Sequence, residues 1–174
     1  MQHNNITTSI QPAASAAVAD VTCRNKIKDL DELAGILERH RAEKQTIVLC
    51  HGVFDLLHIG HIRHFEAAKK NGDILVVTLT ADEYVNKGPH RPVFSQNLRA
   101  EAVAALNCVD YVAINAGPTA VDLINKLRPD FYVKGQDYKD LDGDVTGGIM
   151  LEYEAVESGG GRLVFTDDIV FSSS

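Results

Sequence analysis

Several residue types are scarce in this chain of 174 residues: it has no tryptophan, three cysteines, two methionines and 6% aromatic residues. The widely spaced Cys23, Cys50 and Cys108 form neither a disulfide framework nor a zinc ribbon, and they fit a reducing, cytoplasmic location. The sequence contains no run of about 18 apolar residues, so it predicts no membrane span. Its 17 basic residues are outnumbered by 24 acidic ones, which gives a formal charge of −7. This charge argues against nucleic-acid binding, although a local cluster of cations can still hold a small anion.

What is present is the balance of a single folded domain. At roughly 100–200 residues per domain, the length predicts one domain. Hydrophobic residues make up 45% and charged residues 24%, as in ordinary globular proteins. Residues 1–22 are rich in Thr, Ser, Gln, Asn and Ala and are expected to form a flexible tail. No Lys or Arg precedes the alanine-rich run at residues 13–19, so we do not expect a signal peptide. Residues 23–174 are expected to form the folded domain.

Short apolar runs alternate with amphipathic stretches along that domain. Strands are expected at residues 46–50, 73–79, 109–114, 130–133 and 162–165. Helices are expected at residues 25–45, 59–71, 95–106, 118–127 and 146–158. This alternation predicts an α/β protein, a single Rossmann-like domain with a five-stranded, mostly parallel sheet and helices on both faces. Ligands of such sheets bind beyond the carboxyl ends of the strands, so we look for chemistry there.

The first strand is followed by the string GVFDLLHIGH, residues 52–61. Gly52 allows the backbone to approach a ligand closely. The helix that begins near Ile59 points its free N–H groups at the crevice, which suits a phosphate. His58 and His61 are one helical turn apart and project to the same side. Both can donate hydrogen bonds to an anion whose charge grows during a reaction.

A metal site is the alternative for this histidine-rich segment. Four of the seven histidines lie between residues 51 and 64. At about 100° per residue, however, His58, His61 and His64 fan apart around a helix. No Cys or carboxylate completes a zinc set at the customary spacing. We therefore expect no metal ligand from the protein, and we expect His51 and His64 to support the site or face solvent.

The H-x-G-H string resembles that of the cytidylyltransferase-like nucleotidyltransferases. The closer likeness is to the adenylyltransferase domain of the bifunctional heptose-phosphate kinase/adenylyltransferase. Further matching segments are Lys26-Ile27 with Leu30 and Glu32-Leu33, the loop KGPHRPV at residues 87–93, Arg99, and VKGQDY at residues 133–138. Enzymes of this family join a nucleoside triphosphate to a phosphorylated acceptor and release pyrophosphate without a covalent intermediate.

The resemblance implies roles for individual residues. His58 and His61 would contact the triphosphate and stabilise the transition state, and Lys87 would bridge the acceptor and α-phosphates. Acceptor contacts would come from Asp55, Lys87 and Arg91. Mg²⁺ would be carried by the triphosphate, with no ligand from the protein. Nucleotide contacts would come from Gly52, Val53, Phe54, Gly60, Arg99, Lys134, Gly135, Asp137, Ser172, Ser173 and Ser174.

Several of these roles have a plainer alternative. Lys87 could be an ordinary solvated lysine, and Arg99 could be an exposed helix arginine. Asp55 either holds its loop by accepting backbone N–H groups, as a helix-cap aspartate does, or orients the acceptor. Asp137 either accepts from an exocyclic amine of the base or fixes a turn.

The chain departs from the family pattern at its end. The family has a Ser/Thr-rich turn that opens a last helix, whereas this chain stops at Phe171-Ser172-Ser173-Ser174. We therefore expect it to be part of a longer protein whose next segment is helical, and a sugar kinase is the expected fusion partner. Residues 146–148 and 167–170 match the heptose-type pattern poorly. The resemblance also implies a homodimer.

The sequence thus predicts a nucleotidyltransferase that transfers a nucleotidyl group from ATP or CTP to a sugar phosphate. One alternative is a CTP-dependent glycerol- or ethanolamine-phosphate cytidylyltransferase, because residues 52–65 alone match such enzymes equally well. The other is a regulatory module that binds a nucleotide without turnover.

Overall fold

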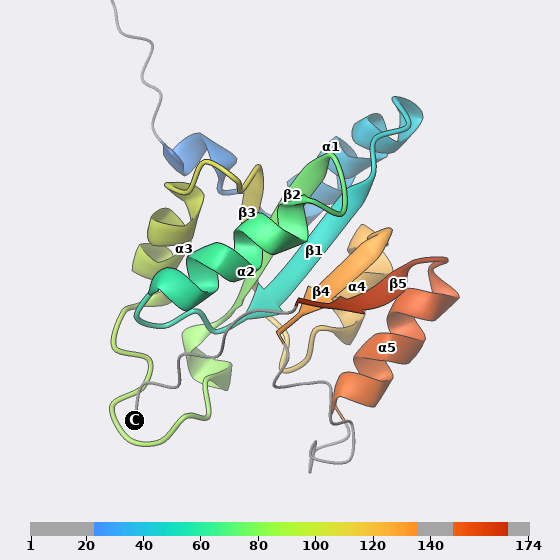
Figure 1. The fold of residues 1–174 in the computed structure, drawn as a ribbon. Helices are drawn as coiled ribbons and strands as arrows, with labels where there is room; N and C mark the ends of the chain where they lie inside the picture. Colours follow the sequence, from blue (N-terminus) through green and yellow to red (C-terminus); the bar gives the residue numbers. More distant parts are fainter. Residues whose placement is uncertain (1–22, 136–147, 167–174) are drawn as a thin grey trace, which may run out of the picture.

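Five parallel strands form the centre of the protein, in the order β3-β2-β1-β4-β5 (Figure 1). The computed structural model describes residues 23–135 and 148–166, so the predicted tail at residues 1–22 lies outside the described residues. All four neighbouring strand pairs are parallel, which confirms the expected α/β class. The strands are β1 (Ile47–Gly52), β2 (Ile74–Thr80), β3 (Tyr111–Asn115), β4 (Phe131–Lys134) and β5 (Arg162–Phe165).

Helices cover both faces of the sheet, as predicted. The helices α1, α4 and α5 pack on one face, and α2 and α3 pack on the other (Figure 1). Along β1, Ile47 and Leu49 point to the first face, whereas Val48 and Cys50 point to the second. Because both faces are buried, the strand reads as one continuous apolar run. The helices are α1 (Leu30–Ala42), α2 (Ile59–Lys69), α3 (Gln96–Ala104), α4 (Val121–Leu127) and α5 (Gly148–Ser158), with short 3₁₀ turns η1 (Cys23–Lys26) and η2 (Asp82–Tyr84).

The first helix is shorter than its hydrophobic spacing predicted. It begins at Leu30 instead of residue 25, because the Asp29 carboxylate accepts the backbone N–H of Glu32 at 2.7 Å and caps the helix there. Ile27, which lies within the range predicted for this helix, forms a parallel β-bridge with Val112 instead. Spacing alone could not separate a helical position from an edge-strand contact at the start of an element.

The segment before α1 therefore lies along the outer edge of β3. Next to the bridge, the Lys26 ammonium group donates to the carbonyl oxygens of Leu106 at 3.0 Å and Val109 at 2.8 Å. These carbonyls lie just beyond the end of α3, where backbone acceptors lack helical partners. The Lys26-Ile27 pair that matched the family thus has a structural role.

Aspartates occupy the amino edge of the sheet. Asp110 accepts the backbone N–H of Leu75 at 2.6 Å and the Lys69 ammonium group at 2.5 Å. Asp130 accepts the N–H of Ile47 at 2.7 Å. These side chains satisfy backbone groups at the start of the strands, so the carboxyl edge is the one left for a ligand.

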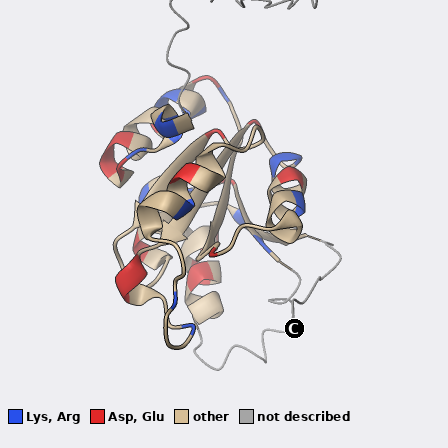
Figure 2. Cartoon of the chain, turned by 90° about the vertical axis from the view of Figure 1, so that its left-hand side faces the viewer, with Lys and Arg blue, Asp and Glu red and all other residues tan. Residues whose placement is uncertain are grey.

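Charge is mixed over the outer surface. In the view of Figure 2, segments coloured for Lys and Arg alternate with segments coloured for Asp and Glu on the helices. Within the described part of the chain, no helix has the length and apolar character needed to cross a membrane.

Candidate functional site

The loop between β1 and α2 is held in an unusual backbone conformation. Phe54 and Leu56 have φ angles of 48° and 54°, in the left-handed region that non-glycine residues seldom adopt. The Phe54 ring lies over Gly52, where an added Cβ would stand 3.0 Å from the ring. The same ring meets His61 edge-on, with centroids 5.4 Å apart, and Phe65 with centroids 4.8 Å apart. Gly52 thus makes room for the aromatic ring that fixes His61.

His58 caps the helix that follows. Its Nδ1 accepts the backbone N–H of Gly60 at 3.1 Å, so the neutral ring carries its proton on Nε2. Gly60 is required by this arrangement, because a Cβ there would stand 2.8 Å from Cε1 and 3.0 Å from Nδ1 of His58. The central glycine of the H-x-G-H string therefore sets where the first histidine points its free donor.

The two histidines stack on each other. The rings of His58 and His61 have centroids 3.9 Å apart and an angle of 25° between their planes. This confirms the expectation that they project to the same side. Burial, followed by electrostatic interaction with His58, His64 and Lys87, lowers the pKa of His61 to about 4. Among the described residues, the buried Nδ1 of His61 has no hydrogen-bond partner. His61 is therefore uncharged at neutral pH in the free protein.

Asp55 holds the lysine loop, residues 85–94, against the β1–α2 loop. Its carboxylate accepts from Arg91 Nη1 at 2.9 Å, from the N–H of Val93 at 2.9 Å and from the N–H of Phe94 at 3.2 Å. Burial raises the pKa of Asp55, but these hydrogen bonds outweigh it and bring the pKa below its usual value. Asp55 accepts backbone N–H groups, as one alternative predicted, but they belong to a distant segment. The helix cap belongs to His58.

Arg99 is buried, so the alternative of an exposed helix arginine is wrong. Its Nε donates to the carbonyl of Phe94 at 3.1 Å, and Nη1 donates to the carbonyl of Val53. Its Nη2 donates to the carbonyl of Thr80 at 2.9 Å and to Asp82 at 2.6 Å. The guanidinium thus joins the end of β2 to the β1–α2 loop and to the end of the lysine loop. The predicted contact with nucleotide stays a prediction.

Lys87 lies exposed on the lysine loop, between η2 and α3. Gly88 and His90, with φ angles of 95° and 61°, shape the tip of this loop. The charge of Lys87 is near enough to contribute to the lowered pKa of His61. The structure thus brings Lys87 to the histidine side of the sheet edge, and its phosphate contact stays a prediction.

Lys134, at the end of β4, is engaged by residues that the sequence analysis did not single out. Its ammonium group lies 2.8 Å from a carboxylate oxygen of Glu152 in α5, and the side chains are only 8% and 13% exposed. The Tyr132 hydroxyl donates to the same oxygen at 2.8 Å. Gly135 is described beside Lys134, whereas Asp137, Ser172, Ser173 and Ser174 lie outside the described residues.

Two further histidines are partly buried and bound to threonines. His51 Nδ1 lies 2.9 Å from the hydroxyl of Thr78, and burial together with the charge of Lys134 lowers the pKa of His51 to about 3. His64 Nδ1 lies 3.0 Å from the hydroxyl of Thr166 and so links α2 to the end of β5. No group of three His, Cys, Asp or Glu side chains in the described ranges is arranged to hold a metal ion.

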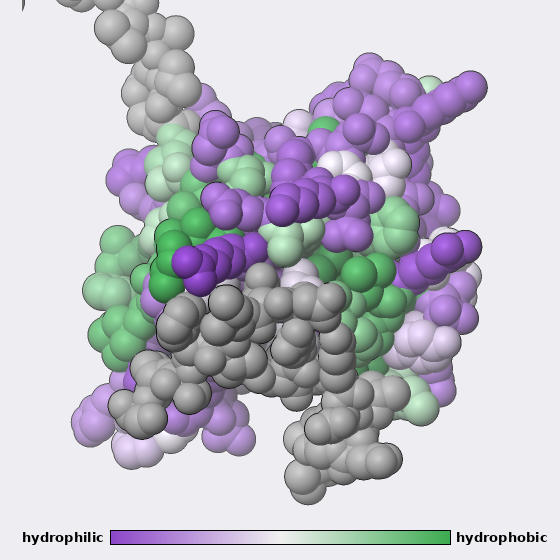
Figure 3. Space-filling view, in the orientation of Figure 1, coloured by the Kyte–Doolittle hydropathy of each residue, from purple (hydrophilic) through white to green (hydrophobic). Residues whose placement is uncertain are grey.

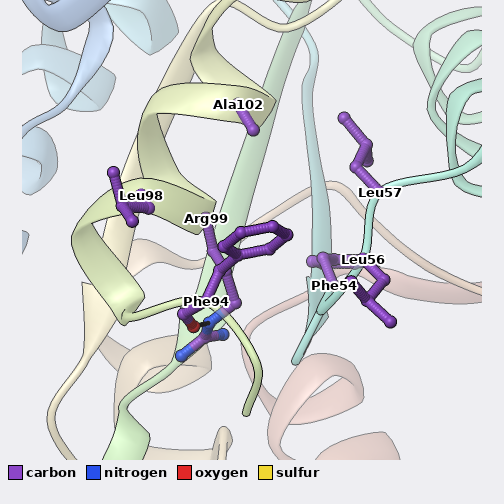
Figure 4. A pocket seen from close by; sticks show the side chains of 7 residues that line it. All are labelled: Phe54, Leu56, Leu57, Phe94, Leu98, Arg99 and Ala102. Carbon is purple, nitrogen blue, oxygen red and sulfur yellow. Dashed lines mark hydrogen bonds between the residues drawn. The ribbon is translucent and has the colours of Figure 1, made fainter.

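An apolar cavity of about 240 Å³ opens beside these loops (Figure 4). The exposed apolar side chains around it gather with others over α3 and the adjoining loops, at the left edge of Figure 3. This cavity was not predicted from the sequence. Its lining residues are Phe54, Leu56, Leu57, Phe94, Leu98, Arg99 and Ala102.

Comparison with known sequences gives a consistent result. A family model described as "Cytidylyltransferase-like" matches residues 49–157. The bifunctional protein HldE of Geobacter sulfurreducens is 43% identical over 140 residues, which are 79% of this chain and 27% of that protein. HldE of Methylobacillus flagellatus is 41% identical over 160 residues, 91% of this chain and 30% of that protein. The chain thus spans about a third or less of the length of these curated relatives.

Comparison with solved structures supports the fold. The lipopolysaccharide core biosynthesis protein from Thermoplasma volcanium matches with a TM-score of 0.60 and 24% identity, over 72% of this chain and 99% of that one. Pantothenate synthetase from Thermus thermophilus matches with a TM-score of 0.55 and 14% identity, over 81% of this chain and 61% of that one.

Proposed function

Because the chain belongs to the cytidylyltransferase-like family, as its motifs predicted, we propose that it transfers a nucleotidyl group from ATP or CTP to a sugar phosphate and releases pyrophosphate. The observation that carries the proposal is the stacked pair of His58 and His61 at the start of α2, with the Nε2 donor of His58 set by its bond to Gly60. Identities of 36–44% to bifunctional HldE proteins, the group that the sugar-phosphate motifs resembled, favour a sugar phosphate as acceptor.

The reaction needs positioning more than it needs a base. An oxygen of the acceptor phosphate, which is already ionised, attacks the α-phosphorus, and the bond to the bridging oxygen breaks as pyrophosphate leaves. Catalysis then consists of holding the groups in line and stabilising charge on the phosphoryl oxygens. The free N–H groups at the start of α2 and the Nε2–H of His58 supply fixed donors for those oxygens.

His61 adds a donor whose charge responds to the substrate. Two stacked rings cannot both be positively charged at little cost, and the pKa of His61 is lowered to about 4 in the free protein. A bound triphosphate brings several negative charges and raises that pKa, because an opposite charge favours the protonated ring. Protonation of His61 is therefore coupled to nucleotide binding.

Lys87 and Arg91 supply positive charge from the lysine loop for the acceptor and α-phosphates. We propose that Mg²⁺ arrives on the triphosphate as part of the substrate. Among the described residues, the carboxylates of Asp55 and Asp82 are already engaged, since Asp55 pairs with Arg91 at 2.9 Å and Asp82 with Arg99 at 2.6 Å. Mg²⁺ commonly keeps several waters and binds substrate phosphates, so phosphate oxygens and water would be its main ligands here.

The test is pyrophosphate release by the full chain with the four common NTPs against a panel of sugar phosphates, glycerol phosphate and ethanolamine phosphate. Replacing His58 or His61 by Ala should lower kcat by roughly 10²–10³, the loss typical of one preorganised donor. His40, which contacts Tyr111 on the opposite face of the sheet, is the matched control, and His40→Ala should leave kcat unchanged. Nucleotide binding without release for any pairing would favour the regulatory module instead.

A further inference from the structure

The hydrogen bonds between Asp55 and the lysine loop have no role in the reaction as proposed above. We propose that Asp55 is a positioning residue, which sets the place of Lys87 by anchoring the far end of its loop. This inference rests on the proposed function, because it gives Asp55 a role in the same transfer.

Within the described part of the chain, the hydrogen bonds that Asp55 accepts come from the lysine loop. Its Oδ2 accepts from Arg91 and from the N–H of Val93, both at 2.9 Å, and its Oδ1 accepts from the N–H of Phe94 at 3.2 Å. The Asp55 side chain is 4% exposed, whereas that of Arg91 is 40% exposed. A carboxylate so enclosed by donors from one segment is placed to hold that segment, and it presents little surface to a substrate.

The near end of the loop is anchored as well. Arg99 donates to Asp82 at 2.6 Å and also to the carbonyl of Val53, two residues from Asp55. Asp82 in turn accepts the backbone N–H of Gln96 at 3.0 Å. Both ends of the lysine loop are therefore tied to the β1–α2 loop, which ends at His58.

Between these anchors lies an exposed span with Lys87 near its start. Residues 86–90 are all exposed, and Gly88 and His90 bend the span with φ angles of 95° and 61°. Such a span has little packing of its own, so the position of Lys87 depends on where the anchors hold its ends. A displacement of about 1 Å in a phosphate-binding group can lower a rate by about 10²-fold.

Asp110 offers a matched control at the opposite edge of the sheet. It also combines one ion pair, to Lys69 at 2.5 Å, with one backbone N–H, that of Leu75 at 2.6 Å. Asp110→Asn therefore removes the same kinds of contact as Asp55→Asn, far from the loops that carry His58 and Lys87.

The first experiment measures kcat, KM and nucleotide affinity for Asp55→Asn, with and without Lys87→Ala, in the full chain. Asp55→Asn should lower kcat by about 10–100-fold when Lys87 is present and by less than about twofold when it is absent, because residues that act as a unit are non-additive. The Kd for NTP should change little, and Asp110→Asn should leave kcat as it is. Equal losses of kcat in both backgrounds would overturn the proposal.

The second experiment tests whether Asp55 holds the lysine loop, by a measurement that does not depend on enzyme activity. Hydrogen exchange at the amides of Val93 and Phe94 should become at least about tenfold faster in Asp55→Asn and stay unchanged in Asp110→Asn, since local opening controls exchange. Unchanged exchange at both amides would refute the anchor. Faster exchange in a protein that releases no pyrophosphate with any pairing would leave the anchor standing and overturn the proposed function.

A variant at the other side of the ion pair covers the case in which Asp55→Asn does not fold. Arg91→Gln changes an exposed side chain and keeps the carboxylate of Asp55. It should speed exchange at Phe94, and this exchange rate is the readout for the variant, because the proposed contact of Arg91 with the acceptor gives kcat a second reason to fall. Unchanged exchange at Phe94 would refute the anchor here too.

Discussion

Gly60→Ala tests the site with the smallest possible change. The added methyl group would stand 2.8 Å from Cε1 and 3.0 Å from Nδ1 of His58, closer than non-bonded atoms approach. The ring of His58 can turn away, whereas the backbone of α2 cannot easily move. Turning the ring breaks its bond to the Gly60 N–H, the stack on His61 at 3.9 Å, and the aim of Nε2.

The expected effect on stability is small because two contributions oppose each other. Loss of a helix cap costs about 0.5–2 kcal/mol. Replacing Gly by Ala inside a helix stabilises it by roughly 0.5–1 kcal/mol. The change in the free energy of unfolding should therefore lie between a gain of about 0.5 kcal/mol and a loss of about 1.5 kcal/mol, the limits that these two ranges give. Activity should fall by about 10²-fold or more, because a preorganised donor is lost.

Two measurements and one control separate these effects. Urea denaturation gives the stability, and pyrophosphate release gives kcat. Gly35→Ala in α1 is the control, because nothing lies within 4 Å of the added methyl group, and it should stabilise the protein without changing kcat. If the Gly60→Ala protein keeps a normal kcat and a normal free energy of unfolding, the reaction does not depend on the position of the His58 ring.

Three further predictions concern single side chains. Lys87→Ala should lower kcat with little change in the Kd for NTP, because a loop lysine that binds the phosphates in the transition state contributes to the chemical step. An unchanged kcat would show that Lys87 takes no part in that step. Arg99→Met should destabilise the protein by about 3 kcal/mol or more, because the carbonyls of Val53, Thr80 and Phe94 lose a shared donor at about 1–3 kcal/mol each. The exposed Arg24→Ala should cost less than about 1 kcal/mol. Equal costs in urea denaturation would contradict this role of Arg99. The pKa of His51 is about 3 in the folded protein, against the usual 6.5. Above pH 6.5 His51 is neutral in both the folded and the unfolded chain, so it does not affect the stability there. Between pH 6.5 and 3 the unfolded chain binds a proton at His51 that the folded chain does not bind. The free energy of unfolding should therefore fall as the pH drops from 6.5 towards 3, and His51→Gln should flatten that part of the curve; the same slope in both proteins would refute this account.

The elements of the fold were predictable because they depend on local spacing. All five strands lie within two residues of their predicted positions, since each is a short apolar run with both faces buried. The order of the strands was not predictable in this way. Spacing along the chain says nothing of whether β1 pairs with both β2 and β4, which depends on how the helices pack.

In the site, too, the features set by local spacing could be predicted and the contacts between distant segments could not. The side-by-side placement of His58 and His61 follows from their separation of one helical turn, so it could be predicted. The partners of Asp55, Arg99 and Lys134 could not be predicted, because each lies on an element distant in sequence or across a loop. Glu152 could not be identified as the partner of Lys134 from the sequence, since a single acidic residue in an amphipathic helix is expected to face solvent.

The segment before α1 has a consequence for behaviour in concentrated solution. β3 is the outermost strand on its side of the sheet, and a free strand edge is a template on which another chain can add a strand. The bridge from Ile27 to Val112, and the bond from the N–H of Lys28 to the carbonyl of Val112 at 2.8 Å, occupy part of that edge. A chain trimmed past Lys28 would keep every residue proposed for the reaction and yet expose the edge of β3. We expect such a chain to aggregate through intermolecular strand pairing, while the activity per folded molecule stays the same.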